Sequence, residues 1–153
     1  VFVDFNTFFT DKEKIKLILH CGDIGSPEFL KESLEGFTGE FFGVLGNMDK
    51  DYKTTIDDYN KMPNVKIAKE ILETEIENKK IAITHKPEDA KILAETGKYD
   101  LVFYGHTHKP CLEKKRQCTI ANPGELAGQI FRPCFAVYDT KNDLLELKIL
   151  EKI

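Results

Sequence analysis

The 153-residue sequence has no long apolar run and little excess charge of either sign. No uninterrupted apolar stretch approaches the roughly 18 residues of a membrane-spanning helix, so we expect no transmembrane segment and no membrane partner. The formal net charge is −4, which is not the basic character of a general nucleic-acid binder, so we expect no nucleic-acid partner. The first residues also lack the basic start and small-residue cleavage site of a signal peptide.

Cysteines are few, and none of the four lies in a Cys-x-x-Cys pair. This spacing argues against a zinc ribbon, and we expect free thiols in a reducing cytoplasm. One alternative concerns Cys111 and Cys118. If Lys114-Lys115 formed the tip of a hairpin, these two thiols would face each other across the strands and could form a disulfide.

Hydrophobic residues make up 41% of the chain and charged residues 31%, the balance of a globular protein. A chain of this length fits one domain, and we assign residues 1–153 to a single domain. Apolar runs alternate with helical patterns, which predicts an α/β sandwich with a mixed sheet. We expect helices after Ser26-Pro27 and Pro87, a weakly helical region over 51–61, a turn at 122–124, and strands over 15–20, 41–45, 65–69, 71–76, 80–84, 101–104, 134–138 and 144–150.

Polar side chains follow several expected strands at the point where each strand ends: Asp23, Asn47, His85, His106 and His108. The carboxyl ends of the strands are where open α/β sheets bind their ligands, so we expect these side chains to meet in one cleft. A mixture of Asp, Asn and His suits divalent first-row metals, and two ions can share one carboxylate. Such a pair activates water and holds a phosphate, which points to phosphoester hydrolysis.

The order of these motifs resembles that of the calcineurin-like metallophosphoesterases, and more closely their small archaeal and bacterial phosphodiesterases. The resemblance is carried by Gly22-Asp23, Gly46-Asn47-x-Asp49, His85, Gly105-His106-Thr107-His108 and Asn122-Pro123-Gly124. It extends from about Ile15 to the C-terminus. It implies an αββα metallophosphoesterase-like sandwich with mixed sheets, and a hydrolase that acts on a small phosphoester.

The resemblance also implies a role for each candidate. Asp23 would bridge two divalent metal ions, Asn47, His85 and His106 would bind one of them, and His108 would complete the other. The catalytic residues would be Asp23, Asn47, His106 and His108, with a metal-bound hydroxide attacking phosphorus. Manganese is the first expectation, with nickel, zinc or iron as alternatives. The oligomeric state is left open, with a homo-oligomer as one alternative.

The sequence departs from the family pattern before Asp23. Members open with a strand that ends in Asp-x-His, and here the only candidate is Asp4-Phe5-Asn6. We therefore include Asp4 as a candidate metal ligand. Only 18 residues separate Asp4 from Asp23, fewer than the roughly 30 of a βαβ unit. We expect the N-terminal strand–helix unit to be truncated or incomplete, and the ion bound by His108 to lack ligands.

For Asp49 and His20, which lie near the candidate ligands in the sequence, we expect roles other than metal binding. We expect Asp49 to order a loop and His20 to be hydrogen-bonded, so neither is assigned to metal binding.

Two other functions of the protein also stay open. One is a non-catalytic scaffold on the same fold, like the retromer subunit Vps29, favoured by the missing Asp-x-His and by the N-terminal phenylalanines. The other is a flavodoxin-like domain with incidental histidines, although no Gly-rich phosphate loop supports it.

Overall fold

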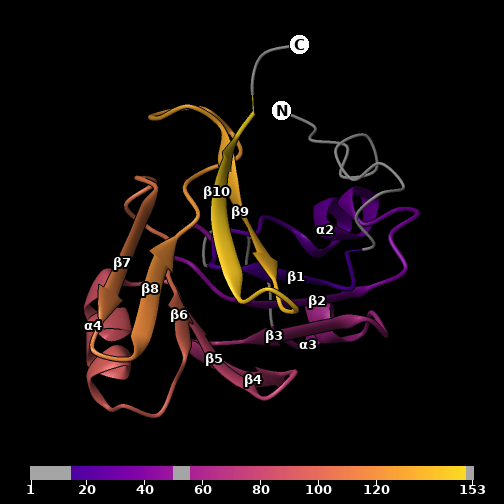
Figure 1. Cartoon of the computed structure of the whole chain (residues 1–153). Helices are drawn as coiled ribbons and strands as arrows, with labels where there is room; N and C mark the ends of the chain where they lie inside the picture. The colour runs from indigo at the N-terminus through magenta and orange to yellow at the C-terminus, as the bar shows by residue number, and fades with distance from the viewer. Residues whose placement is uncertain (1–14, 50–55, 151–153) are drawn as a thin grey trace. The chain divides into compact units, whose positions relative to one another are not determined.

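The computed structural model describes residues 15–49 and 56–150 and has a mixed α/β fold (Figure 1). The chain divides into two compact units, Val1–Leu72 and Glu73–Ile153. Asp4, the N-terminal phenylalanines and the expected N-terminal strand–helix unit lie outside the described residues. The assignment of the chain to one domain and the αββα layering remain predictions.

The first unit contains a parallel sheet of β1 (Leu17–His20), β2 (Glu40–Val44) and β3 (Val65–Ala68), in that order. Helix α2 (Pro27–Ser33) begins at the expected position, with the Ser26 hydroxyl accepting a hydrogen bond from the Phe29 amide at 3.1 Å. Proline in the first turn loses no helical hydrogen bond, because the amides of that turn have no partner within the helix. In the polar region after β2, the residues that the structure describes form the short helix α3 (Ile56–Asn60).

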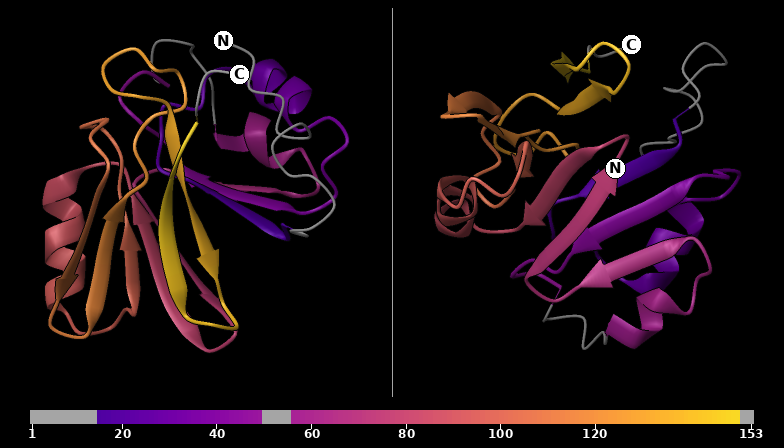
Figure 2. Two further views of the ribbon diagram at one scale, coloured as in Figure 1. Left: turned by 45° about the horizontal axis from the view of Figure 1, so that its top comes forward. Right: turned by 60° about the horizontal axis from the view of Figure 1, so that its bottom comes forward.

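Helices α2 and α3 cover the same face of this sheet (Figure 2). Leu30 of α2 and Tyr59 of α3 pack with Phe41 of β2 and with Val65 and Ile67 of β3. The last two residues are two positions apart on one strand and therefore point to the same side. Ile18 of β1 packs against the same core, and β1 and β2 each lead into a loop that contains a candidate ligand.

The second unit contains a mixed sheet in the order β4-β5-β6-β8-β7. Strands β5, β6 and β8 are parallel to one another, and β7 is antiparallel to β8. Strands β4 and β5 are joined by Glu77 and Asn78, whose φ angles of 47° and 66° suit a two-residue hairpin turn. The bounds are β4 (Ile71–Ile76), β5 (Lys79–Thr84), β6 (Leu101–Phe103), β7 (Cys111–Lys115) and β8 (Cys118–Asn122).

Helix α4 (Pro87–Glu95) packs on one face of β5, β6 and β8 (Figure 1). Ala90 and Ala94 are buried in this contact with Ile120 of β8. Gly97 follows the helix at a φ of 70°, a conformation that glycine adopts readily at a helix end. The sequence pattern also places Ile92 on the apolar face, which is wrong, because its side chain is 63% exposed.

The β7–β8 hairpin turns two residues later than the sequence suggests. Its tip is Arg116–Gln117 instead of Lys114-Lys115, because β7 continues through both lysines. Cys111 is therefore paired with Asn122, and it does not face Cys118. None of the four cysteines, all of them described residues, is in a disulfide, and the cross-strand disulfide is excluded.

The chain continues into β9 (Cys134–Asp139) and β10 (Leu144–Ile149), which pair antiparallel as expected. In the turn between them, Asp139 Oδ1 accepts hydrogen bonds from the amides of Lys141 and Asn142 at 2.9 and 3.2 Å. Among the described residues, no helix has the length and apolar character needed to cross a bilayer.

Candidate functional site

Asp23 joins the loops that follow β1 and β2 in the first unit. Its backbone is left-handed, with a φ of 59°. Its Oδ1 atom accepts a hydrogen bond from the Met48 amide at 2.9 Å. Asn47, the residue before Met48, lies at an exposed position of the same loop. The structure therefore brings the loops of these two predicted ligands together.

Gly46 leaves the space that Asp23 occupies. A Cβ atom on Gly46 would lie 2.0 Å from Asp23 Oδ1 and 2.4 Å from the Asp23 backbone nitrogen. Real side chains do not approach this closely, so any residue larger than glycine would displace Asp23. The Gly-Asn motif thus has a steric reason as well as a chemical one.

Asp49 orders both loops, as expected. Its side chain is only 1% exposed. Oδ2 accepts hydrogen bonds from the amides of Asp23 and Gly46 at 3.0 and 2.7 Å, and Oδ1 accepts one from Gly25 at 3.0 Å. Bonds from backbone amides to a charged carboxylate are stronger than neutral ones. Asp49 therefore fixes the backbone from which Asp23 projects.

His20 and Cys21 precede this loop, and their surroundings indicate structural roles. His20 Nδ1 accepts a hydrogen bond from the Gly22 amide at 3.3 Å, which agrees with the hydrogen-bonded role expected for His20. Cys21 is buried, and burial raises the pKa of its thiol to about 12. At neutral pH it is a thiol and not the thiolate that would attack an electrophile or bind a metal.

In the second unit, His85 and His106 lie side by side. His85 follows β5, and its carbonyl oxygen accepts a hydrogen bond from the Gly105 amide at 3.2 Å. His85 Nε2 and His106 Nδ1 are 3.2 Å apart, and the two rings meet at 75°. Two nitrogens that each lie 2.0–2.1 Å from one tetrahedral ion would be about 3.3 Å apart. The pair therefore fits two ligands of one cation.

His108 contacts a carboxylate that sequence reasoning missed. Its Nδ1 atom is 3.3 Å from Glu125 Oε2. Glu125 is 8% exposed and also accepts hydrogen bonds from the amides of Gln129, Ile130 and Phe131. Burial by itself raises the pKa of Glu125, but the hydrogen bonds from Phe131, Ile130, His108 and Gln129 outweigh it and hold that pKa below its usual value. The available signal was an acidic residue directly after Asn-Pro-Gly.

Asn122 holds the loop of the two histidines in place. It is fully buried, and its Nδ2 atom donates to the Gly105 carbonyl at 3.0 Å and to Thr107 Oγ1 at 2.9 Å. Its Oδ1 atom accepts from the Gly124 amide at 2.8 Å. Within the second unit, the expected Asn-Pro-Gly turn does lie beside the loop that contains His106 and His108.

The candidate ligands concentrate backbone strain. Asp23, His106 and His108 have φ angles of 59°, 65° and 59°. A non-glycine residue in this region costs about 1–3 kcal/mol, and such residues cluster at functional sites. The other described non-glycine residues with positive φ all lie in tight turns between strands: Glu77, Asn78, Arg116 and Asp143.

The candidate metal donors are divided between the units. Asp23 and Asn47 belong to the first, and the histidines His85, His106 and His108 to the second. Over residues 15–49 and 56–150, no three His, Cys, Asp or Glu side chains are grouped as a metal site. The donor types nevertheless fit divalent first-row cations, which accept imidazole, carboxylate and carbonyl ligands.

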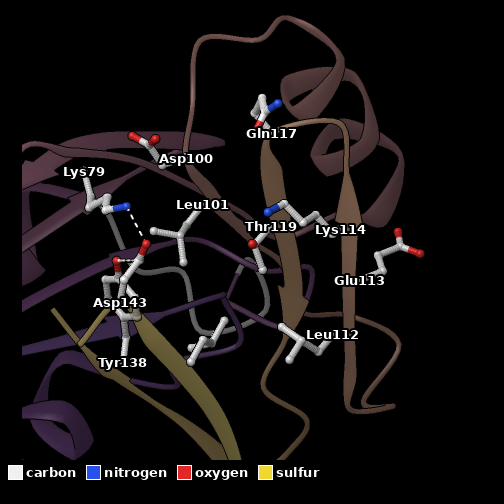
Figure 3. A pocket seen from close by; sticks show the side chains of 11 residues that line it. Lys79, Asp100, Leu101, Leu112, Glu113, Lys114, Gln117, Thr119, Tyr138 and Asp143 are labelled. Atoms are coloured by element: carbon white, nitrogen blue, oxygen red, sulfur yellow. Dashed lines mark hydrogen bonds and ion pairs between the residues drawn. The ribbon is translucent and has the colours of Figure 1, made fainter. Parts of the chain in front are cut away.

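A cavity of about 420 Å³ lies elsewhere in the second unit (Figure 3). Lys79 stands at the start of β5, whereas His85 follows its end, so the cavity is at the opposite ends of the strands from the histidines. Lys79 Nζ is 2.7 Å from Asp143 Oδ2, and the Tyr138 hydroxyl donates to Asp143 Oδ1 at 2.6 Å. The Lys79–Asp143 ion pair ties the β9–β10 hairpin to β5, and the Tyr138 bond lies within the hairpin. None of the candidate ligands lines this cavity.

Comparison with known proteins identifies the family. A calcineurin-like phosphoesterase superfamily domain matches residues 6–143. The chain belongs to this superfamily. Phosphodiesterase MJ0936 of Methanocaldococcus jannaschii is 29% identical over 145 residues, which cover 91% of this chain and 85% of that protein. The probable metallophosphoesterase MJ0623 of the same organism is 31% identical over 124 residues, 76% of this chain and 56% of that relative.

Solved structures agree with this assignment. The structure of a novel archaeal phosphodiesterase has a TM-score of 0.82 and 26% identity, covering 94% of this chain and 88% of that one. Vacuolar protein sorting 29 of Cryptosporidium parvum has the same fold, with a TM-score of 0.63, 21% identity, and coverage of 92% and 82%. The mixed α/β metallophosphoesterase fold is confirmed. This member of the superfamily is a hydrolase of phosphoesters, a class of enzymes that uses divalent metals.

Proposed function

We propose that this superfamily member is a metal-dependent phosphodiesterase that cleaves a small phosphoester at a dinuclear site. The observation that carries the proposal is the 3.2 Å contact between His85 Nε2 and His106 Nδ1, in the loops that follow two neighbouring parallel strands. The phosphodiesterase relatives support the reaction class. The proposed ligands of the two cations are Asp23, Asn47, His85, His106 and His108, with Asp4 as a further candidate.

Two cations in such a site lower the pKa of a bound water and stabilise the charge on the leaving oxygen. The protein's own residues supply the rest. Asp49 holds the backbone of Asp23 through a hydrogen bond, and the lack of a side chain on Gly46 leaves room for the Asp23 carboxylate. The exposed amide group of Asn47 would donate a hydrogen bond to a phosphate oxygen. Asn122 keeps the histidine loop in its strained conformation.

The donor set decides which metals we propose. Carboxylate and amide oxygens suit manganese, whereas imidazole also suits zinc, iron and nickel. Since Asp23 and Asn47 contribute oxygen and the three histidines contribute nitrogen, manganese is the first proposal and the others are alternatives.

The location that we propose is a reducing cytoplasm. None of the four cysteines is in a disulfide, which agrees with this location.

The test is hydrolysis of bis-p-nitrophenyl phosphate by the purified chain with manganese, nickel or zinc, and after treatment with a chelator. We expect turnover that depends on the metal and is faster than turnover of p-nitrophenyl phosphate, a monoester. A chain that binds none of these metals and hydrolyses neither compound would contradict the proposal.

A non-catalytic scaffold is the second candidate function. It is favoured by Asp4-Phe5-Asn6 standing where the family has Asp-x-His, whereas the likeness to vacuolar protein sorting 29 shows the fold alone. The two candidates differ in one measurement. Metal binding without any phosphodiester hydrolysis supports the scaffold, and hydrolysis by this same chain argues against it.

A further inference from the structure

We propose that Glu125 is a positioning residue that fixes the tautomer of His108, so that Nε2 is the nitrogen of His108 with a lone pair available for a ligand. Because Glu125 also accepts hydrogen bonds from the following loop, it would hold that loop and the His108 imidazole in place together. What Nε2 binds depends on the proposed function, whereas the tautomer does not.

The Glu125 carboxylate is held rigidly. Its Oε1 atom accepts hydrogen bonds from the amides of Ile130 and Phe131 at 2.7 and 2.6 Å. Its Oε2 atom accepts one from Gln129 at 3.1 Å and lies 3.3 Å from His108 Nδ1. Three successive backbone amides therefore fix the plane of the carboxylate, and the fourth contact is directed at the histidine.

The hydrogen bonding of this carboxylate determines where the His108 proton lies. Three backbone amides donate to its two oxygens, and hydrogen bonds of this kind favour the ionised carboxylate. An ionised carboxylate only accepts hydrogen bonds, so the facing Nδ1 atom has to carry a proton. In the neutral ring, Nε2 is then the nitrogen with a free lone pair. A carboxylate behind an imidazole orients metal-binding histidines in the same way.

The loop that follows Glu125 is compact for the same reason. Gly128 has a φ of 64°, and a Cβ atom there would lie 2.7 Å from the Pro133 ring. The loop thus closes on itself while three of its amides point to one side chain. Removal of the carboxylate would release these amides and His108 together, which a purely local role for Glu125 does not predict.

The decisive variant is Glu125→Gln, which keeps the size of the side chain. The amide oxygen would stay at the Oε1 position, because the Ile130 and Phe131 amides both donate there. The NH₂ group would then face His108 Nδ1 and turn it into an acceptor. We expect His108 to change from the Nδ1–H tautomer to the Nε2–H tautomer. Glu75→Gln, an exposed substitution on β4, is the matched control.

The tautomers are read from ¹⁵N chemical shifts of the imidazoles in long-range NMR spectra of the full chain. Only four histidines are present, and His108→Asn identifies the His108 signals. In Glu125→Gln we also expect faster hydrogen exchange at the amide of Gln129, whose acceptor Oε2 is replaced by the NH₂ group. We expect Mn²⁺ affinity to be about 10–100-fold weaker, the usual effect of losing such a partner. Glu75→Gln should change none of these.

An Nε2–H tautomer in the wild-type protein would overturn the proposal, as would an unchanged tautomer in a folded Glu125→Gln variant. If this variant does not fold, the wild-type tautomer alone decides. If the wild-type protein shows the Nδ1–H tautomer but neither binds Mn²⁺ nor hydrolyses phosphodiesters, the proposed function fails and the positioning role of Glu125 stands.

Discussion

His85 Nε2 and His106 Nδ1 lie 3.2 Å apart, although 20 residues separate them in the sequence. The contact exists because β5 and β6 are adjacent and parallel, so their carboxyl ends deliver the two rings to the same edge of the sheet. The Gly105 amide donates a hydrogen bond to the His85 carbonyl oxygen, and this bond fixes the distance between the loops that follow β5 and β6.

Substitution of His106 should remove hydrolysis while His20 tolerates change. We expect His106→Asn to lower the metal-dependent kcat/KM by at least about 100-fold, because loss of a ligand exceeds the 10–100-fold effect of losing an outer partner. His20→Asn should lower it much less, since His20 accepts a hydrogen bond from Gly22 and has no proposed metal. The kinetics of bis-p-nitrophenyl phosphate hydrolysis check both. Equal losses would contradict the assignment.

Gly46→Ala should damage the site through sterics. The new methyl group would collide with Asp23, and overpacking of this kind typically costs about 1–3 kcal/mol. Urea unfolding measures the change in stability. Gly97→Ala is the control. Its left-handed backbone disfavours alanine, but no atom beyond the adjoining residues lies within 4 Å of the added Cβ. We expect both variants to lose stability but only Gly46→Ala to lose hydrolysis. Full activity of Gly46→Ala would show that Asp23 can move without consequence.

The thiols should react at very different rates. Burial raises the pKa of Cys21 to about 12, so at pH 8 only about one molecule in ten thousand carries the thiolate that reacts. Burial also raises the pKa of Cys118. With Ellman's reagent we expect the half-buried Cys111 to react first, and Cys21 and Cys118 to react only when the protein unfolds. Four equal rates in the native protein would contradict this.

The ion pair at the cavity should affect the ionisation of Tyr138. Burial, followed by the hydrogen bond to Asp143, raises the pKa of Tyr138 above its usual value of 10.0. A phenol whose pKa is raised by folding stabilises the protein fully below about pH 10, and this contribution is lost as the pH rises further. We expect Asp143→Asn to lower the pH at which Tyr138 ionises, measured by absorbance at about 295 nm. An unchanged titration would mean that Asp143 has no influence on the phenol.

Local patterns predicted most of the elements. The alternation over Ile71–Ile76 gave that strand its observed bounds, and Ser26-Pro27 marked the start of α2. Both signals depend on residues within one turn or one strand, so the sequence contains them in full. The helix over Pro87–Glu95 followed from the same kind of pattern.

The errors concern contacts between distant residues. The turn at Arg116–Gln117 depends on how β7 pairs with β8, which two consecutive lysines cannot indicate. Ile92 fits a helical apolar pattern, but the sheet beneath α4 is already covered by Ala90 and Ala94. Glu125 was missed because its partners become neighbours only when the loop closes. The sequence was sufficient to predict the types of candidate ligand, but it was not sufficient to predict Glu125, which orients one of them.

Anomalous scattering from a manganese-soaked crystal, recorded near the manganese absorption edge, tests the central claim directly. We predict two peaks, with Asp23 bridging both ions, Asn47, His85 and His106 on one of them, and His108 on the other. Full occupancy of manganese at positions bound by none of these side chains, or Asp23 and His106 on opposite sides of the molecule, would contradict the account.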